Sequence, residues 1–370
     1  MNEMYAFVEQ AVQNYQPLQD ELSKKIFWAR LALEFDPSPE NTAQLVSLGE
    51  QQGWLDVLLR RIPSILHAVE RDHKKLILYG TNVTGRAIAA RLMEMQADFY
   101  GFCGRRAKEF PGGLMGKPVL SPDYLFQHAD EFYIILSASE AEEEILNTLR
   151  NHDFPQAHIL FYPKLARGED HQYFEFPSLF PPGTAFIDGG CLDCRTSYLF
   201  SDWCGGKYSK IFAFEPDPIS CSICEQRLSE KKIRDFRLIR CGLSDHTGKK
   251  AFRADLYGCS HIVADGNVEG EHVVAVPVTT IDDTAGEEKI GFIKLDIEGS
   301  ELDALHGAEK VISRDQPLLA VSVYHRRGDM VAIMDYLHRL VPEYHFWLRH
   351  YSVGAADTVL YASVSLLNEQ

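Results

Sequence analysis

The sequence predicts an α/β protein in which two parallel sheets, each covered by helices, follow a helical N-terminal segment. From about residue 74 onward, short apolar runs that suit buried strands alternate with amphipathic segments that suit helices. This alternation is typical of parallel sheets with helices on their faces. It stops at a proline-rich stretch, PSLFPPG at 177–183, and then begins again. We therefore predict three parts, at 1–73, 74–164 and 165–370.

The first part, 1–73, is predicted to be helical. Apolar residues recur there at spacings of three and four, as one buried face of a helix requires. The clearest runs are Leu18–Leu22–Ile26–Phe27–Leu31 and Leu55–Leu58–Leu59–Ile62. Pro37 and Pro39 lie between these runs and break the helical pattern. We interpret this part as a helical cap or as an arm that joins copies of the chain into a homo-oligomer.

The other two parts each contain a series of strands. In the middle part we expect strands at KLILYG, ADFYGFC, EFYIILSAS and AHILFY, with helices at GRAIAARLMEM and EAEEEILNTLR. In the third part we expect strands at TAFIDGG, KIFAFEP, RLIRCG, FIKLDI and LLAVSVYH. Two late strands, HFWLRHY and DTVLYASV, close the chain.

The composition excludes several classes of partner. The formal net charge is −16, which argues against nucleic acid and against a basic membrane-binding surface. No apolar run approaches the roughly 20 residues that a membrane-spanning helix needs. The first residues, MNEMYAFVEQ, lack the basic patch and apolar core of a secretory signal. We therefore expect a cytoplasmic protein with a small or neutral substrate.

Eight cysteines in such a protein are expected to be reduced thiols. Two pairs, Cys191/Cys194 and Cys221/Cys224, have the CxxC spacing of some zinc sites. Small thiols also pack well in turns and at the start of helices, and this is the interpretation that we favour. We accordingly predict no metal.

A glycine turn and an acidic residue point to an adenosine-containing cofactor. An apolar strand ends in Asp188, and Gly189 and Gly190 follow it. Glycines at this place let the backbone turn sharply and pass close to a ligand. The next strand ends in Glu215, which is placed to accept hydrogen bonds from ribose hydroxyls, and Pro216 then turns the chain away.

The acidity of this turn favours S-adenosylmethionine over NAD. NAD binding usually needs a third glycine and a helix N-terminus that cradles the pyrophosphate. The pattern here is D-G-G-C-L-D-C, which has no third glycine. An acidic loop suits a ligand that has no phosphate and carries a sulfonium and an ammonium group instead.

Two further strands bring polar side chains to the same edge of the sheet. FIKLDIEGSE delivers Asp296 and Glu298, and LLAVSVYH delivers Tyr324 and His325. In open α/β sheets the ligand binds at this carboxyl edge.

The third part resembles the FkbM family of methyltransferases. The matching pieces lie in order over about half of the chain: IDGGCLDCRTSYLF, FAFEPDP, CGLSDHTG, VPVTTIDD and IKLDIEGSELDALHGA. The resemblance implies a class I, Rossmann-like methyltransferase domain that ends in an antiparallel strand pair. It also implies methyl transfer from S-adenosylmethionine to a hydroxyl, often on a sugar or polyketide.

By this resemblance, each part of the cofactor has expected neighbours. The methionine end would lie against Asp188, Gly189 and Gly190, the ribose against Glu215 and Pro216, the adenine near Cys241 and Gly242, and the transferred methyl beside Asp296 and Glu298. The first loop departs from the family pattern, because Cys191 and Cys194 replace the usual alanine and glycine. The side chain of Cys194 is expected to narrow the cofactor pocket.

Transfer to a hydroxyl also needs a group that removes the hydroxyl proton. His325 is our first candidate for this base, because histidine titrates near neutral pH, and Asp296 is the second. Two alternatives stay open. A histidine at a strand end often has only a structural role, and Asp296 with Glu298 could form a metal pair.

The middle part contains a degenerate dinucleotide motif, G-T-N-V-T-G, in which Asn82 replaces the central glycine. This part resembles small Rossmann-like domains of sugar-modifying enzymes. We state as a hypothesis that Gly80, Asn82 and Gly85 form a nucleotide-sugar site, with a role in assembly as the alternative.

These features together predict an O-methyltransferase that acts on a glycan or a related hydroxylated small molecule. The first alternative is a nucleotide-sugar- or NAD-dependent enzyme centred on 74–164. The second is a catalytically inactive protein with a methyltransferase-like fold that binds partners.

Overall fold

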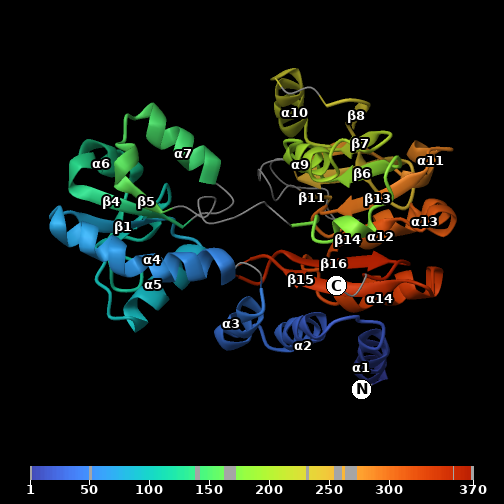
Figure 1. The fold of residues 1–370 in the computed structure, drawn as a ribbon, viewed down its shortest axis with the longest axis horizontal. Coiled ribbons are helices and arrows are strands. Elements are labelled where there is room, and N and C mark those ends of the chain that lie inside the picture. Colours follow the sequence, from blue (N-terminus) through green and yellow to red (C-terminus); the bar gives the residue numbers. More distant parts are fainter. Residues whose placement is uncertain are drawn as a thin grey trace. The chain divides into compact units, whose positions relative to one another are not determined.

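The computed structural model describes residues 2–49, 52–137, 142–161, 172–230, 233–253, 261–262, 273–352 and 354–367. The chain forms two compact units (Figure 1). Unit 1 comprises Met1–Leu48, Asp170–Tyr351 and Ala355–Gln370, and unit 2 comprises Gly49–Glu169 and Ser352–Gly354. The predicted helical segment 1–73 is therefore shared between the two units.

Four helices make up the N-terminal segment. Helices α1 (Asn2–Tyr15), α2 (Glu21–Phe35) and α3 (Pro39–Ser47) belong to unit 1, and α4 (Gln52–Arg71) belongs to unit 2. Asp20 caps α2 by accepting a hydrogen bond from the backbone N–H of Ser23. Pro39 occupies the first turn of α3, where its missing N–H costs nothing. None of the helices in the part of the chain that the structure describes is long and apolar enough to cross a membrane.

Unit 2 contains a five-stranded parallel sheet in the order β3-β2-β1-β4-β5. Its strands are β1 (Lys75–Tyr79), β2 (Gly101–Cys103), β3 (Val119–Leu120), β4 (Phe132–Leu136) and β5 (Ile159–Phe161). Its helices are α5 (Val83–Glu94), α6 (Pro122–Gln127) and α7 (Glu142–Asn151), with short 3-10 turns at Ala107–Glu109, Ala129–Glu131 and Gln156–His158. The sequence did not predict β3, because its two residues are too few to give a pattern.

Unit 1 is built on a seven-stranded sheet in the order β15-β16-β14-β13-β6-β7-β8. The strands are β6 (Ala185–Gly189), β7 (Ile211–Phe214), β8 (Phe236–Ile239), β13 (Ile290–Leu295), β14 (Leu318–Ser322), β15 (His345–His350) and β16 (Thr358–Ser363). Strand β16 runs antiparallel to both of its neighbours, and the other pairs are parallel. The predicted α/β class, with two parallel sheets and a late antiparallel pair, is confirmed.

A second sheet in unit 1 was not predicted. It has four strands in the order β11-β10-β12-β9: β9 (Gly242–Leu243), β10 (Gly248–Arg253), β11 (His261–Ile262) and β12 (Val273–Thr279). The predicted strand RLIRCG is too long, because β8 ends at Ile239 and Gly242 belongs to β9. Two of these strands have only two residues, so a periodic pattern cannot show them.

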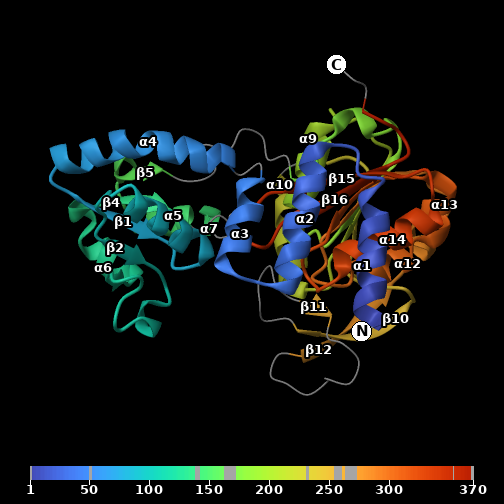
Figure 2. The same ribbon diagram turned by 90° about the horizontal axis from the view of Figure 1, so that it is seen from below.

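Helices and aromatic side chains cover the two faces of the large sheet. Helices α12 (Glu301–His306), α13 (Glu309–Asp315) and α14 (Asp329–Leu340) pack with α2 in one apolar core. The other face carries α9 (Arg195–Trp203) and the aromatic residues of 173–180, including the 3-10 turn Pro177–Leu179. Helices α10 (Pro218–Glu230) and α11 (Ile281–Ala285) complete the unit (Figure 1). Figure 2 shows α1 beside α14.

The N-terminal helices cover the edge strand β15. The backbone between α1 and α2 pairs with this strand, and the N–H of Gln19 donates to the carbonyl of Phe346 at 3.0 Å. Arg349 forms an ion pair with Asp20 at 2.8 Å. An uncovered edge strand presents unpaired backbone groups that invite aggregation, and the segment between α1 and α2 pairs with part of this edge.

We predict that Phe27→Ala lowers the free energy of unfolding of unit 1 by about 3–5 kcal/mol, because its fully buried ring fills the core between α2 and the sheet. Trp28→Ala is the matched control, because the neighbouring indole is 46% exposed. Denaturant unfolding of both full-length variants measures the difference. Equal losses in the two variants would contradict the packing of α2 on this sheet.

Candidate functional site

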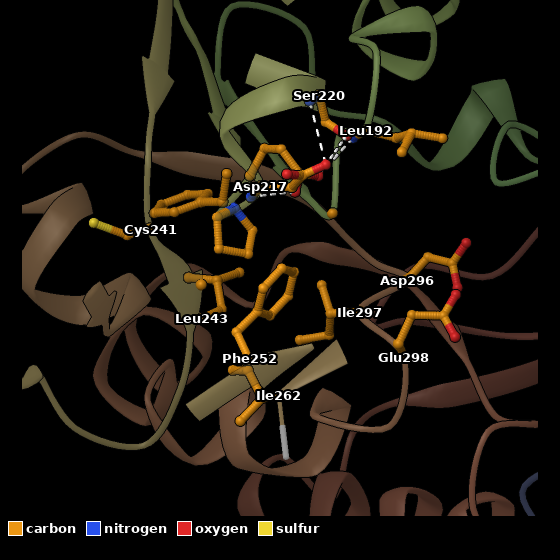
Figure 3. A pocket seen from close by; sticks show the side chains of 15 residues that line it. Leu192, Asp217, Ser220, Cys241, Leu243, Phe252, Ile262, Asp296, Ile297 and Glu298 are labelled. Atoms are coloured by element: carbon orange, nitrogen blue, oxygen red, sulfur yellow. Dashed lines mark hydrogen bonds between the residues drawn. The ribbon is translucent and has the colours of Figure 1, made fainter. Parts of the chain in front are cut away.

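A pocket opens at the carboxyl ends of β6, β7 and β13, which are neighbours in the large sheet (Figure 3). Its floor and walls come from these strand ends and from the second sheet. The residues that line it are Gly190, Leu192, Phe214, Glu215, Pro216, Asp217, Ser220, Cys241, Gly242, Leu243, Phe252, Ile262, Asp296, Ile297 and Glu298. The strand ends thus converge as the sequence predicts.

A buried ion pair fixes the glycine turn. Lys294, near the carboxyl end of β13, lies 3.2 Å from Asp188, and the two side chains are 2% and 0% exposed. The ammonium group of Lys294 also donates to the carbonyls of Gly189 and Gly190, at 2.9 and 2.7 Å. Burial opposes the charge of Lys294, but attraction to Asp188 and Asp296 raises its pKa. The pair therefore holds the turn against the neighbouring strand.

Glycine is required at the turn for steric reasons. Gly190 has φ +72°, and a Cβ there would lie 2.0 Å from the carbonyl oxygen of Asp296. No side chain can occupy that position without moving the backbone of the acidic strand end. The turn and the end of β13 consequently form one rigid wall of the pocket.

Glu215 ends β7 and is positioned by backbone donors. Its carboxylate accepts hydrogen bonds from the N–H groups of Leu192 and Asp217, at 3.0 and 2.9 Å. Burial raises the pKa of Glu215 to about 7, although these two backbone donors oppose the shift. The carboxylate is therefore held at the pocket wall by backbone donors, and no cationic side chain of the described residues hydrogen-bonds to it.

The pocket wall carries four carboxylates, from Glu215, Asp217, Asp296 and Glu298. Among the described residues that line it there is no lysine or arginine. A wall of this kind repels phosphate groups and attracts a cationic ligand. This charge pattern suits a sulfonium compound far better than a dinucleotide.

Two tyrosines hold the carboxylate of Asp296. The hydroxyl of Tyr173 donates to it at 2.6 Å, and the hydroxyl of Tyr324 does so at 3.3 Å. Burial works against the charge of Asp296, but Lys294, His325 and the Tyr173 hydroxyl keep its pKa below the usual value. Asp296 is therefore an ionised and immobile group at neutral pH.

His325 is surrounded by carboxylates. Its Nδ1 lies 2.9 Å from Glu301, and its Nε2 lies 3.5 Å from Asp296 and 3.6 Å from Glu298. Burial disfavours its charge, but Glu301 and the other two carboxylates outweigh that effect and raise the pKa of His325 to about 9. Burial also raises the pKa of Glu298 to about 7. His325 and Glu298 therefore lie beside the pocket close enough for the charge of each to affect the pKa of the other.

The N-terminal helix α2 braces the loop that carries His325. Arg30 donates to the carbonyl of Tyr324 at 3.1 Å, and Glu34 accepts from the N–H of Gly328 at 2.9 Å. Both side chains are 7% exposed. The helical segment, which the sequence suggested was only a cap or arm, thus contributes to the site.

The structure brings together most of the residues that the sequence predicts for the site. Gly190, Glu215, Pro216, Cys241, Gly242, Asp296 and Glu298 line the pocket. Asp188 and Gly189 lie behind the wall and support it, and His325 contacts Asp296 and Glu298 from the far side. The sequence analysis did not select Tyr173, Lys294, Glu301 or Arg30. A lysine inside an apolar strand was the one signal that could have identified Lys294.

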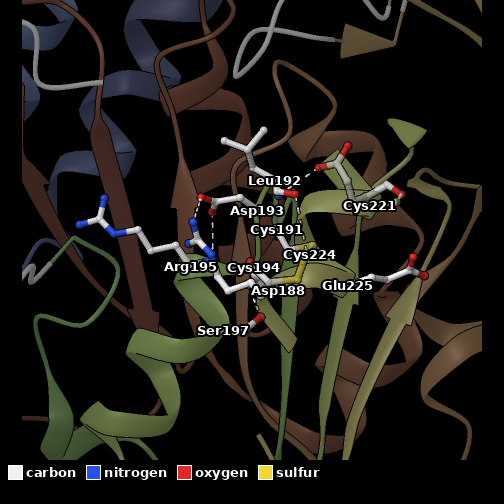
Figure 4. Close-up of a disulfide and its surroundings, with 12 residues drawn as sticks. Asp188, Cys191, Leu192, Asp193, Cys194, Arg195, Ser197, Cys221, Cys224 and Glu225 are labelled. Atoms are coloured by element: carbon white, nitrogen blue, oxygen red, sulfur yellow. Dashed lines mark hydrogen bonds and ion pairs between the residues drawn. A yellow bond between two sulfur atoms is a disulfide. The ribbon is translucent and has the colours of Figure 1, made fainter. Parts of the chain in front are cut away.

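The cysteines next to the turn differ from the expectation (Figure 4). Cys194 and Cys224 form a disulfide that joins the first loop to α10, so these two are not reduced thiols. Cys194 has φ +60°, which explains why glycine suits the position. Its fully buried side chain points to α10 and is absent from the pocket lining, so the predicted narrowing of the pocket by Cys194 is wrong.

In unit 2 the predicted nucleotide motif has a structural explanation. Asn82 caps α5 by accepting from the N–H of Gly85 at 3.0 Å. A Cβ on Gly85 would lie 2.1 Å from the carbonyl oxygen of Gly80, so glycine permits close packing of helix on strand. Arg105 and Arg106 pair with Glu144 and Glu109. Binding of a nucleotide sugar by these residues stays a prediction.

Comparison with known proteins finds a similarity between the large-sheet domain and methyltransferases. Residues 193–346 match the model of the methyltransferase FkbM domain. A protein of Beauveria bassiana (strain ARSEF 2860) named Methyltransferase 1 is 25% identical over 153 residues, which cover 35% of this chain and 60% of that protein. The 2-O-methyltransferase NoeI of Sinorhizobium fredii (strain NBRC 101917 / NGR234) is 24% identical over 151 residues, which cover 36% of this chain and 60% of that protein.

The chain thus spans about 60% of the length of these curated relatives. Among solved structures, methyltransferase FkbM from Methylobacillus flagellatus KT is 18% identical. The match covers 85% of this chain and 100% of that chain, with a TM-score of 0.42.

Lys294→Met is predicted to lower the free energy of unfolding by about 3–5 kcal/mol, because it leaves Asp188 buried without a cation. The same variant should bind S-adenosylhomocysteine more weakly, since the glycine turn loses its anchor. Denaturant unfolding and calorimetry measure the two effects. Lys289→Met, an exposed lysine just before the same strand, is the control. If Lys294→Met keeps the wild-type stability and the wild-type affinity, Lys294 does not anchor the glycine turn.

The raised pKa of Glu215 predicts a pH-dependent affinity. The ionised carboxylate is a much stronger acceptor for the ribose hydroxyls than the protonated acid, so affinity for S-adenosylhomocysteine should increase up to about tenfold from pH 6 to pH 8. Titration calorimetry across this range measures the effect. In Glu215→Gln the increase should disappear, and affinity should fall by about 1.5–3 kcal/mol. An increase that persists in this variant would assign the titration to Glu298 instead.

Proposed function

We propose that the protein is an S-adenosylmethionine-dependent O-methyltransferase of the FkbM family, because residues 193–346 match the model of the methyltransferase FkbM domain. Its acceptor is a hydroxyl on a sugar, a polysaccharide precursor or a related natural product. The observation that carries the proposal is the pocket wall of four carboxylates at the carboxyl ends of three adjacent strands.

The chain's own groups provide each contact that the cofactor needs. Glu215 would hold the ribose hydroxyls, and Cys241 and Gly242 would face the adenine. The turn at Gly190 would face the methionine end, and the ionised Asp296 would attract its positive charge. When bound, S-adenosylmethionine supplies an electrophilic methyl group, and the enzyme then works mainly by positioning.

We assign removal of the acceptor proton to the group formed by His325, Glu298 and Asp296. The pKa of about 9 means that His325 is mainly protonated at neutral pH, so it acts as a base only in its minor neutral form. Glu298, with a pKa of about 7, is half ionised there and provides a second acceptor. Glu301 fixes the ring of His325 by contact with Nδ1 and leaves Nε2 directed towards Asp296 and Glu298.

The acceptor class is supported by one relative, which is named a 2-O-methyltransferase and is 24% identical over the matched residues. An acceptor without phosphate groups also agrees with the acidic pocket. We therefore propose a neutral, hydroxyl-rich acceptor.

Two measurements test the proposed function. Calorimetry with S-adenosylhomocysteine and with NADH should give binding for the first ligand only. Incubation with S-adenosylmethionine that carries a tritiated methyl group, together with a cell glycan extract, should give labelled glycan. Binding without transfer to any extract fraction would favour the non-catalytic binding protein, and failure to bind S-adenosylhomocysteine would end the proposal.

His325→Ala should slow methyl transfer by about 10²-fold or more, because general base catalysis is lost. Its dissociation constant for S-adenosylhomocysteine should stay unchanged, because His325 does not line the cofactor pocket. Single-turnover transfer and calorimetry separate the two effects. Full activity in this variant would move the base to Asp296 or Glu298.

Glu301→Gln should lower the pKa of His325 from about 9 towards its ordinary value, because the contact at Nδ1 loses its negative charge. An NMR titration of the histidine ring measures this shift without any acceptor. Glu309→Gln, an exposed carboxylate on the next helix, is the control and should leave the titration unchanged. An unshifted pKa in Glu301→Gln would remove Glu301 from this role.

A further inference from the structure

The first loop of the pocket is the segment 190–194 that follows β6. Three buried cysteines lie in this loop or directly behind it, and none has a part in the proposed chemistry. Cys191 and Cys194 belong to this loop, and Cys224 belongs to α10. All three are at most 1% exposed. The sulfur of Cys191 lies 3.8 Å from each of the other two sulfurs, which form the disulfide (Figure 4). The cluster thus contains both cysteines of the first CxxC pair, Cys191 and Cys194, and one cysteine of the second pair, Cys224.

The loop that the disulfide holds has an unfavourable backbone. Leu192 has φ +48° and Cys194 has φ +60°, so two residues with side chains adopt the left-handed conformation. Such residues are strained and persist only where the surroundings hold them. The disulfide is the covalent tie that fixes Cys194 to α10, and the ion pair of Asp193 with Arg227 at 2.8 Å lies beside it.

The same loop presents a donor to the ribose-binding carboxylate. The N–H of Leu192 lies between the two cysteines of the loop and donates to Glu215 at 3.0 Å. Leu192 and Glu215 both line the pocket. If the loop relaxes and Leu192 moves away, Glu215 loses this hydrogen bond. The pKa of Glu215 then rises, because the bond stabilises the ionised carboxylate. The disulfide is therefore linked to the proposed ribose-binding carboxylate through Leu192.

We propose that Cys191, Cys194 and Cys224 form a thiol–disulfide site that controls how tightly the first loop holds the nucleoside cofactor. With the disulfide formed, the strained loop is fixed and affinity is high. A dithiol reductant breaks the bond between Cys194 and Cys224 by donating two electrons and two protons. The products are two cysteine thiols and the disulfide of the reductant. The loop then relaxes and affinity falls. The effect on affinity rests on the proposed function.

Cys191 has a defined place in this site. Burial, with Asp188 and Glu215 nearby, raises the pKa of its thiol well above the usual value. A protonated thiol is a poor nucleophile, so Cys191 does not readily exchange with the adjacent disulfide. The disulfide between Cys194 and Cys224 is therefore stable towards Cys191. It is reduced only when the loop opens and an external dithiol reaches the buried sulfurs.

The test compares oxidised and reduced forms of the full-length protein. After equilibration with glutathione disulfide, thiol titration in denaturant should find two fewer thiols than the eight cysteines of the chain. The dissociation constant for S-adenosylhomocysteine should rise about tenfold after reduction with dithiothreitol. Cys224→Ala should show the reduced-form constant under both conditions. Cys204→Ser, a cysteine outside the cluster, should respond like the wild type.

Thermodynamic linkage adds a second readout that needs only the wild type. If oxidation strengthens binding by a given factor, saturating S-adenosylhomocysteine must make the disulfide harder to reduce by the same factor. A dithiothreitol/disulfide redox titration with and without the ligand measures this shift, and it remains available if Cys224→Ala does not fold.

Each other outcome overturns the proposal. Eight free thiols in the oxidised sample would show that the disulfide does not form. One zinc ion per chain in freshly purified protein would make the three sulfurs metal ligands instead. Equal affinities of the oxidised and reduced forms would remove the control of binding and leave the proposed function intact. A protein that binds S-adenosylhomocysteine in neither form would refute the proposed function, and this inference would fail with it.

Discussion

The buried ion pair between Asp188 and Lys294 is the constraint on which the rest of the site depends. It joins the ends of two adjacent strands, and the same ammonium group holds both carbonyls of the glycine turn. Because Gly190 touches the backbone of Asp296, the position of the turn also sets the position of the acidic strand end. A charge buried this deeply is tolerated only with its partner, so the geometry allows little variation. The glycine turn and the acidic end of β13 are therefore held in one position relative to each other.

The negative charge of the pocket exceeds what its surroundings neutralise. Asp188 and Asp296 share the only lysine near the turn in the described part of the chain, and Glu215 and Glu298 lie at the wall with raised pKa values near 7. A cationic ligand would reduce this repulsion. The same carboxylates raise the pKa of His325 to about 9.

The sequence predicted the parts of the site that are local in the chain. Asp188, Glu215 and Asp296 each end an apolar run, and the rule that ligands bind at the carboxyl ends of parallel strands placed them together. Tyr173 and Arg30 escaped prediction, because they reach the site from a connector and an N-terminal helix that lie 123 and 294 residues from their partners. The disulfide escaped as well, since it crosses between the two CxxC pairs and spacing alone cannot give the pairing. Strands of two residues, such as β3 and β9, carry no periodicity.

The division of the chain has a consequence for attempts to produce its C-terminal half alone. Unit 2 interrupts unit 1, and residues 1–48 pack on the edge strand of the large sheet and brace the loop beyond Tyr324. The first helices are thus integral to a fold whose remaining residues follow more than a hundred positions later. A truncated protein that began at about residue 170 would expose a bare sheet edge and leave that loop unsupported. The large-sheet unit therefore needs the first helices, although more than a hundred residues separate them from its first strand.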